Sequence, residues 1–328
     1  MLSINRINWG IIGCGDVTEL KSGPAFNKVP NSSLVAVMRR NGDKAADYAK
    51  RHQVPRWYND AEKLINDSEV NAIYIATPPD AHEAYTIAAI KAGKPVYVEK
   101  PMALNSKAAK NMFITAAEYN VKLVVAHYRR EWPLFKKLKQ LVDDKVISDI
   151  RLVRLVFDKP ALTAQELAQE KTTWRVNPEI AGGGLFHDLA PHQLDIMYYL
   201  FGPSKTMHGF AINQAKSYAA DDLVTGNILF SNGVAFSGTW CFNANTEADC
   251  CEIIGSEGSI RFSFFSGNSI ELITNKETTT FNFDALQHVQ QPMIEKTVQY
   301  FLGHGDNPCK GNEGALIMRW MERFANSR

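Results

Sequence analysis

The chain has 328 residues, too many for one ordinary hydrophobic core and enough for two domains. Its 36 basic and 35 acidic residues give a formal net charge of +1, so the charge balance points to neither a nucleic acid nor a membrane surface as a partner. A composition of 45% hydrophobic and 22% charged residues is that of an ordinary globular protein, which argues against disorder and fibrous repeats.

Short apolar segments alternate with amphipathic segments over the first third of the chain. Strands are predicted at residues 7–12, 34–38, 72–76, 96–98 and 123–126, and helices at residues 43–51, 61–66, 81–92 and 106–119. The predicted strands are apolar throughout, as buried parallel strands are. The alternation predicts an α/β Rossmann domain, a doubly wound parallel sheet that binds a dinucleotide, over residues 1–126.

The first predicted strand runs directly into Gly13-Cys14-Gly15-Asp16-Val17-Thr18. This turn fits the first two positions of the dinucleotide fingerprint G-x-G-x-x-G/A. The first glycine permits a tight turn, and the second lets backbone amides approach a pyrophosphate. We therefore expect Gly13, Gly15, Asp16 and Val17 to bind the cofactor. Because Thr18 replaces the third small residue, we expect a looser contact between the next helix and the sheet.

The end of the second predicted strand indicates which cofactor is bound. NAD enzymes usually place an acidic residue there for the ribose 2′-hydroxyl, whereas this strand ends in Arg39 and Arg40. Guanidinium groups suit a 2′-phosphate, so the sequence predicts NADP in preference to NAD. The alternative is that both arginines are solvated surface charges. Asp43 is expected at a helix start rather than on the ribose.

Polar residues follow three further predicted strands at the edge where such sheets hold ligands. Thr77 and Pro78 with His82 follow the third strand, Glu99-Lys100-Pro101 the fourth, and Tyr128-Arg129-Arg130 the fifth. The Lys100–Pro101 bond is a candidate cis peptide, since cis bonds are essentially confined to X-Pro. We expect His82 to have a structural rather than a chemical role beside the cofactor.

The pattern changes in the second half of the chain. Helices are predicted at residues 133–144 and 185–201, strands with turn signals between 206 and 283, and two further helices at 288–302 and 314–325. This order predicts an α+β domain with a large, mainly antiparallel open sheet over residues 127–328.

These features in this order resemble the glucose–fructose oxidoreductase/inositol dehydrogenase/MocA family. The resemblance covers at least residues 9–202 and includes the glycine turn, Thr77-Pro78, Glu99-Lys100-Pro101, Trp174-Arg175 and the run GGGLFHDLAPHQLD at residues 182–195. It implies hydride transfer between a nicotinamide cofactor and a carbon that bears a hydroxyl or carbonyl group. The implied substrate is a sugar, cyclitol or related polyol. A homodimer or homotetramer formed through the C-terminal sheet is also implied.

The resemblance also assigns roles to single residues. Lys100 is implied near the nicotinamide and the reacting oxygen, where an ammonium stabilises negative charge. Asp188 and His192 lie four residues apart and so share one face of a helix, with His192 as proton donor and acceptor. Asp188 either orients the imidazole or binds substrate, and Asp195 is also within reach of His192. The alternative is that both residues are purely structural, with Asp188 as an acid in the first turn of a helix and His192 as a core histidine.

The resemblance places further residues at the same sites. The predicted catalytic residues are Lys100, Asp188 and His192, and these also bind substrate together with Tyr128. The remaining predicted cofactor contacts are Thr77, Pro78, His82, Glu99, Lys100, Arg129, Trp174 and Arg175.

Other readings of the sequence remain open. His187, Asp188 and His192 have metal-ligand side chains, but residues 187 and 192 diverge around a helix, so we expect no metal site. Rival functions are a redox-neutral, nicotinamide-dependent glycosidase and a non-catalytic NADP sensor.

Three features of the sequence bear on where the protein is located. Its five cysteines are scattered and do not resemble a disulfide framework. No apolar run approaches the ~20 residues that span a bilayer, and residues 1–8 are too polar for a secretory signal. We therefore expect a cytoplasmic protein.

Overall fold

The computed structural model describes residues 5–325, which form two compact units. Unit 1 runs up to Tyr128 and also takes up Leu286–Met318. Unit 2 consists of Arg129–Ala285 and the chain from Arg319 onward. The change from one unit to the other at residue 128 lies close to the boundary predicted from the sequence. The return of residues 286–318 to the first unit was not expected.

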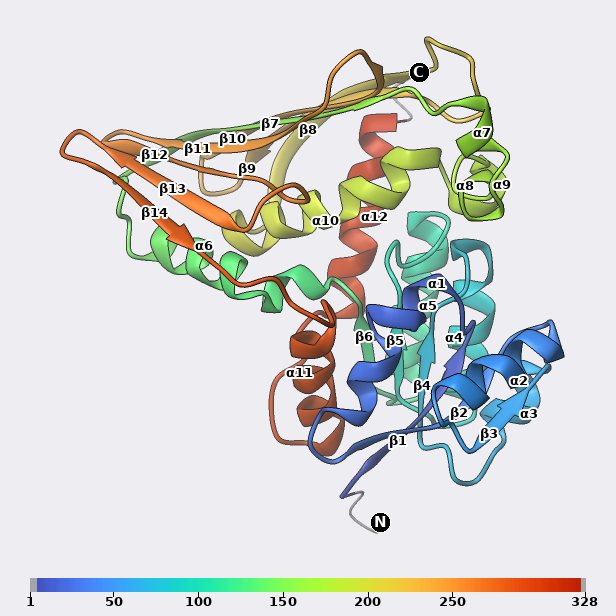
Figure 1. Ribbon diagram of the computed structural model, residues 1–328. Helices are drawn as coiled ribbons and strands as arrows, with labels where there is room; N and C mark the ends of the chain where they lie inside the picture. The colour runs from blue at the N-terminus through green and yellow to red at the C-terminus, as the bar shows by residue number, and fades with distance from the viewer. Residues whose placement is uncertain (1–4, 326–328) are drawn as a thin grey trace. The chain divides into compact units, whose positions relative to one another are not determined.

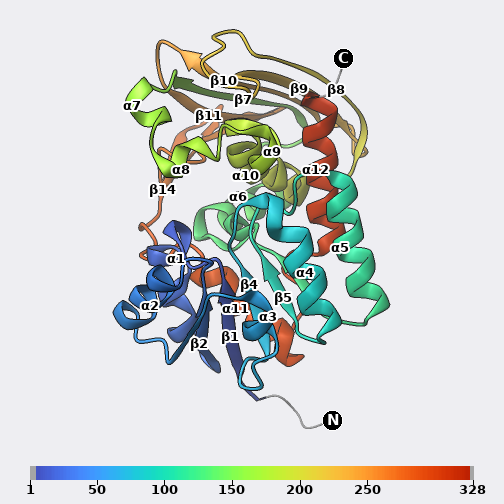
Figure 2. The ribbon, with the colours of Figure 1, turned by 90° about the vertical axis from the view of Figure 1, so that its right-hand side faces the viewer.

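Unit 1 contains a six-stranded sheet and the helices around it (Figure 1). Its strands are β1 (Ile7–Ile12), β2 (Ser32–Met38), β3 (Arg56–Tyr58), β4 (Ala72–Ile75), β5 (Val96–Val98) and β6 (Leu123–Val125). Its helices are α1 (Asp16–Leu20), η1 (Gly23–Asn27), α2 (Gly42–Arg51), α3 (Ala61–Ile65), η2 (Pro79–Ala81), α4 (His82–Lys91), α5 (Ser106–Glu118), α11 (Gln291–Leu302) and the first part of α12 (Gly311–Ala325). Figure 2 shows α4 and α5 side by side.

The sheet of unit 1 is parallel throughout, with the strand order β3-β2-β1-β4-β5-β6. The predicted doubly wound Rossmann fold is therefore confirmed. Strand order reverses between β1 and β4, and ligands bind such sheets at the carboxyl ends of the strands beside this switch point. The carboxyl ends of β1, β2, β4 and β5 carry the glycine turn, Arg39, Thr77 and Lys100, so the topology gathers these residues at one edge.

Residues 286–318 join unit 1 through contacts that are far apart in the sequence. The backbone N–H of Val125 in β6 donates to the carbonyl oxygen of Cys309 over 3.1 Å, and Asn307 Nδ2 donates to Leu123 O over 2.9 Å. These bonds cover part of the edge that β6 would otherwise leave open, and an uncovered edge strand invites pairing with other chains.

Unit 2 contains an eight-stranded sheet. Its strands are β7 (Ile150–Pro160), β8 (Ser204–Ile212), β9 (Leu223–Phe230), β10 (Ala235–Ala244), β11 (Ala248–Gly255), β12 (Gly258–Phe262), β13 (Ser269–Thr274) and β14 (Thr278–Asn282). Helices α6 (Pro133–Asp143), α7 (Ala164–Leu167), α8 (Glu170–Thr173), α9 (Pro178–Ala181) and α10 (Gly184–Phe201) complete it, and the turn η3 (Tyr128–Glu131) leads into it.

The strand order in unit 2 is β14-β13-β12-β11-β7-β10-β9-β8. Every neighbouring pair is antiparallel except β7 and β10, which run parallel, so the predicted α+β domain with a mainly antiparallel sheet is confirmed. No strand was predicted over β7 from the sequence. Its signal is present, because Val153, Leu155 and Phe157 are buried and alternate with exposed residues.

The two faces of this sheet differ. Figure 1 shows α6 and α10 beneath one face of the sheet, with no helix of the described residues over the other. That outer face exposes the large apolar side chains of Val156, Phe210, Ile212 and Leu229. The strand register places these four on the same side, since Phe210 pairs with Thr225 and Val156 lies between Thr239 and Cys250.

Candidate functional site

The glycine turn at the end of β1 has the geometry of a dinucleotide-binding loop. Gly13 has φ +96°, and a Cβ atom built there would lie 2.7 Å from the backbone nitrogen of Thr77, so only glycine fits. A Cβ on Gly15 would meet nothing nearer than Gly13 O at 4.0 Å. The backbone at Gly15 is thus open to close approach by a ligand, which is what the second glycine of the fingerprint provides.

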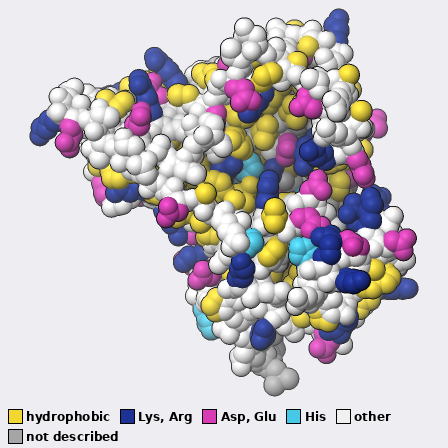
Figure 3. All heavy atoms as spheres, viewed as in Figure 1, with side chains coloured by type: hydrophobic (Ala, Val, Ile, Leu, Met, Phe, Trp, Pro, Cys, Tyr) yellow, Lys and Arg dark blue, Asp and Glu magenta, His cyan; other side chains and the backbone are white. Residues whose placement is uncertain are grey.

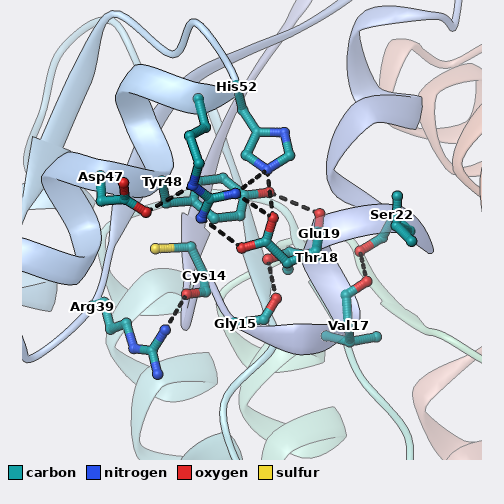
Figure 4. A network of polar contacts seen from close by, with 12 residues as sticks. Cys14, Gly15, Val17, Thr18, Glu19, Ser22, Arg39, Asp47, Tyr48 and His52 are labelled. Atoms are coloured by element: carbon teal, nitrogen blue, oxygen red, sulfur yellow. Dashed lines mark hydrogen bonds and ion pairs between the residues drawn. The ribbon is translucent and has the colours of Figure 1, made fainter.

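Thr18, at the third position of the fingerprint, is held by hydrogen bonds within the turn and to α2. Its side chain is fully buried, and Oγ1 donates to Gly15 O over 2.8 Å. The hydroxyl of Tyr48 on α2 donates to Thr18 O, also over 2.8 Å (Figure 4). The threonine hydroxyl thus bonds within the turn, and the expected looser contact between helix and sheet stays a prediction.

Arg39 extends from the end of β2 toward the glycine turn. Its Nη1 atom lies 3.4 Å from Cys14 O, as Figure 4 shows, whereas Arg40 is exposed. Asn41 caps α2 by accepting a hydrogen bond from the Lys44 N–H, and Asp43 lies in the first turn of that helix. Asp43 therefore starts a helix, as predicted.

An ion-pair cluster holds α1 against the end of α2 (Figure 4). Glu19 accepts hydrogen bonds from Arg51 (2.7 and 2.8 Å) and from His52 Nε2 (2.7 Å). The Arg51 guanidinium, with a smaller contribution from His52, lowers the pKa of Glu19 to about 2. In the glycine turn, burial raises the pKa of the Cys14 thiol to about 11. This cysteine therefore stays protonated and is not a nucleophile.

His82 connects the loops that follow β4 and β5. Its buried ring places Nε2 2.7 Å from Thr77 O and Nδ1 3.0 Å from Pro101 O. A neutral imidazole donates to only one of these carbonyls, and the imidazolium donates to both. Burial lowers the pKa of His82, and the two carbonyls partly offset that effect. His82 thus connects the loop of Thr77 to the loop of Pro101, which is consistent with the structural role expected for it.

Glu99 lies in a buried hydrogen-bond network behind Lys100. The hydroxyl of Tyr74 and the side-chain amide of Gln290 both donate to its carboxylate. Gln290 also accepts from the Tyr97 hydroxyl over 2.9 Å. Burial, with the Glu99 charge second, raises the pKa of Tyr74 well above its ordinary value, so Tyr74 stays a donor.

Lys100 is the next residue in the chain after Glu99 and so adjoins this network. Its backbone N–H donates to Glu99 Oε2 over 3.1 Å, and its side chain is half-buried. The Lys100–Pro101 peptide is cis, as predicted. The lysine thus stands on a loop that is held by a buried carboxylate on one side and by His82 on the other.

In unit 2, a glycine-rich turn leads into α10, the helix that carries Asp188 and His192. Gly182 and Gly184 have φ values of +89° and +70°. His192 is buried, and its ring meets that of Phe265 edge-on, with centroids 5.8 Å apart. Asp188 forms an ion pair with Arg175, whose Nε lies 3.3 Å from Asp188 Oδ2.

The arginines predicted around the site have specific partners in unit 2. The guanidinium of Arg129 lies between the rings of Trp132 and Phe265, 4.3 and 4.5 Å from their centroids, and Nη1 donates to Phe264 O over 2.5 Å. Arg175 stacks on Trp174 at 4.5 Å in addition to pairing with Asp188. Contacts of Arg129, Trp174 and Arg175 with a cofactor stay predictions.

Arg130 forms a buried ion pair with Asp195. Its Nε and Nη2 atoms bind the two carboxylate oxygens over 2.9 and 2.6 Å, and the side chains are only 5% and 1% exposed. Asp195, which the helical spacing placed within reach of His192, therefore has a strong partner from η3.

His187 packs within unit 2 beside the turn that precedes α10. A Cβ on Gly183 would lie 2.0 Å from His187 Nδ1, so the absence of a side chain at Gly183 makes room for the ring. Burial lowers the pKa of His187 to about 4, which keeps it neutral at physiological pH. His187 is thus a buried, neutral ring packed against the turn of Gly183.

The predicted residues thus form one set in each unit. In unit 1, the glycine turn, Arg39, Thr77, His82 and Lys100 lie along one sheet edge. In unit 2, Asp188 and His192 share α10 with Arg175 beside them. Gln290 and Phe265 were not predicted from the sequence, because they meet their partners only through folding.

The described residues were compared with the patterns of a metal site, a membrane helix and a charged surface. Residues 5–325 hold no group of three or more His, Cys, Asp or Glu side chains arranged to bind a metal ion. Within the same part of the chain, no helix is long and apolar enough to cross a membrane. On the face shown in Figure 3, basic and acidic side chains are interspersed.

Comparison with known proteins identifies the family of the chain. A family model described as an oxidoreductase family with an NAD-binding Rossmann fold matches residues 7–127. A model of the GFO/IDH/MocA C-terminal domain matches residues 135–261. Together the two models cover most of the chain and both of its units.

Individual relatives extend the match over the whole chain. Oxidoreductase P35 of Formosa agariphila is 47% identical over 323 residues, which are 98% of this chain and 99% of that protein. The trans-1,2-dihydrobenzene-1,2-diol dehydrogenase of Bos taurus is 28% identical over 84% of this chain and 79% of its own. A levoglucosan dehydrogenase solved with NADH and levoglucosan shares the fold, with a TM-score of 0.86 and 22% identity over 97% of this chain and 96% of that one. The chain therefore belongs to the GFO/IDH/MocA family and is a nicotinamide-dependent oxidoreductase.

Proposed function

We propose that the protein is an NADP-preferring dehydrogenase or reductase that acts on a CH–OH carbon of a sugar, cyclitol or related polyol. The observation that carries this proposal is the edge of the unit 1 sheet. There the open glycine turn, Arg39, Thr77 and the loop of Lys100 follow neighbouring parallel strands, which is where this fold class binds dinucleotides.

The residues of unit 1 fit a nicotinamide dinucleotide. The open backbone at Gly13–Val17 suits a pyrophosphate, and Arg39 beside the turn suits the 2′-phosphate of NADP, which accepts charge-assisted hydrogen bonds. The Thr77 hydroxyl is buried and has no hydrogen-bond partner among the described residues, so it is available to a ligand at the switch point. A bound nicotinamide would supply the hydride chemistry.

The protein's own residues then handle the substrate oxygen and its proton. We assign the proton transfer to His192, because imidazole exchanges protons near neutral pH. Lys100 stabilises negative charge that develops on the oxygen. Asp188, fixed by Arg175, orients the substrate or the imidazole. The sugar and diol names of the relatives support a polyhydroxy substrate.

Two further proposals concern the protein as a whole. The apolar outer face of the unit 2 sheet (Val156, Phe210, Ile212 and Leu229) supports a homodimer or homotetramer formed through that face. Phe210→Glu should then reduce the mass in solution measured by light scattering. The five cysteines are all free thiols, which supports a cytoplasmic location.

Turnover on a panel of sugars, inositols, polyols and diketones tests the proposed function. With NADP or NAD supplied in excess, we expect the absorbance of reduced nicotinamide to change stoichiometrically with product. A product formed without a net absorbance change would indicate a redox-neutral glycosidase. Tight cofactor binding with no turnover on any member of the panel would indicate a nucleotide sensor.

A further inference from the structure

The loop between β12 and β13, residues 263–268, is shaped by a single carboxylate. Asp249 on β11 accepts backbone N–H bonds from Phe264 (3.0 Å), Phe265 (2.6 Å) and Ser266 (2.8 Å), and the Ser266 hydroxyl lies 3.1 Å from Oδ2. The Ser263 hydroxyl also donates to Asp249 O over 2.7 Å. Hydrogen bonds to a carboxylate are stronger than those to a neutral acceptor, so Asp249 fixes three consecutive residues of this loop.

The loop fixed in this way carries two contacts toward the residues around His192. The carbonyl oxygen of Phe264 accepts the bond from Arg129 Nη1 at 2.5 Å. The ring of Phe265 lies against the Arg129 guanidinium at 4.5 Å and meets the His192 ring edge-on at 73°. Phe157 of β7 supports the Phe265 ring from the sheet, with centroids 5.1 Å apart.

These contacts form a continuous path from a sheet carboxylate to the imidazole. Edge-to-face ring pairs and cation–π contacts have a preferred geometry, so a shift of Phe265 alters both neighbours together. The backbone amides of residues 264–266 are held by Asp249, so its removal frees the segment that aims Phe265. All of these residues belong to unit 2.

We propose that Asp249 is a positioning residue for His192, acting through the 263–268 loop and the Phe265 ring. The proposal rests on the proposed role of His192 in proton transfer. Asp249 acts through the loop and is not itself a catalytic group. It sets the direction of the imidazole, and a catalytic group must be held in its productive orientation for efficient proton transfer.

The direct test is an NMR spectrum of the histidine rings in the full-length protein. The chain has eight histidines, and His192→Asn identifies the His192 signal by its loss. Asp249→Ala and Phe265→Leu should each displace that signal. The first lets the Phe265 ring move away from His192, and the second removes the ring, so both change the ring-current shift at His192. Glu252→Gln is the matched control, since it removes a carboxylate from the same strand that pairs with Arg261 instead, and it should leave the signal in place.

Kinetics of the same variants give the second readout. Asp249→Ala and Phe265→Leu should lower kcat by about 10- to 100-fold while the KM for the dinucleotide stays unchanged, and Glu252→Gln should keep both constants. A His192 signal that Asp249→Ala leaves in place while Phe265→Leu moves it would overturn the proposal. A wild-type protein with no turnover would refute the proposed function, and the NMR comparison would still decide whether Asp249 positions His192.

Discussion

Arg39 lies beside the glycine turn, with its guanidinium Nη1 3.4 Å from the carbonyl oxygen of Cys14. The residue follows β2, whose end selects between NAD and NADP in this fold class. A cation at this position supports the proposed preference for NADP.

Replacing Arg39 should change cofactor choice. We expect Arg39→Ala to raise the Kd for NADPH by about tenfold or more, since a charge-assisted hydrogen bond is lost. The Kd for NADH should change little, because NADH lacks the 2′-phosphate. Lys50→Ala, which removes an exposed cation from the last turn of α2, is the control and should bind both cofactors as the wild type does. Equal weakening of NADH and NADPH by Arg39→Ala would reject the contact.

The buried ion pair of Arg130 and Asp195 should be important for stability. Asp195→Ala leaves the buried guanidinium without this counter-charge, so we expect the free energy of unfolding to fall by about 3–5 kcal/mol. Denaturant titration measures this change. Asp149→Ala, which removes an exposed partner of Arg151, should leave the midpoint almost unmoved. Similar midpoints for the two variants would show that the buried pair is not structurally important.

The buried ring of His187 should make the protein less stable in mild acid. Its pKa is about 4 in the folded state against an ordinary value of 6.5, so as the pH falls the unfolded chain takes up the proton first. Stability should therefore be fully present above pH 6.5 and should decrease toward pH 4, by up to about 3 kcal/mol from this group.

Chemical denaturation at a series of pH values checks this dependence. His187→Leu should flatten the slope over the same pH range, and His304→Leu, at an exposed position, should not. If His187→Leu retains the full wild-type slope, another group causes the acid sensitivity.

His82 should couple stability to cofactor binding, because its ring joins the loops of Thr77 and Pro101. His82→Ala leaves buried carbonyls without their donor and opens a cavity, so the free energy of unfolding should fall by about 2–4 kcal/mol. The Kd of the dinucleotide, measured by fluorescence titration, should rise as well. His304→Ala at an exposed position is the control. Unchanged stability and affinity in His82→Ala would contradict the bridging role.

The sequence predicted most of the fold because the relevant patterns are local. The apolar strands and the glycine turn at residue 13 mark the Rossmann unit within a few residues of where each element begins and ends. Two strands were not predicted. β3 is a three-residue edge strand with little apolar signal, and β7 was overlooked although its residues alternate between buried and exposed.

The side-chain partners within the site could not be read from the sequence. Gln290 reaches Glu99 across 191 positions, and Arg130 reaches Asp195 across 65. Such pairs depend on where the chain returns, and residues 286–318 return to unit 1 through contacts that no local pattern encodes. Thr18 is a similar case, since its hydroxyl bonds back into the turn and so fits a position where a smaller residue is usual.

We propose that Lys100 and His192 both serve the chemical step, and a double-mutant cycle tests this proposal most directly. We expect Lys100→Ala and His192→Ala each to lower kcat by about a hundredfold or more with the best substrate of the panel. Groups that act together in one step are strongly non-additive, so the double variant should be little slower than the slower single variant. Losses that multiply in the double variant, or near-wild-type rates in both single variants, would contradict the account.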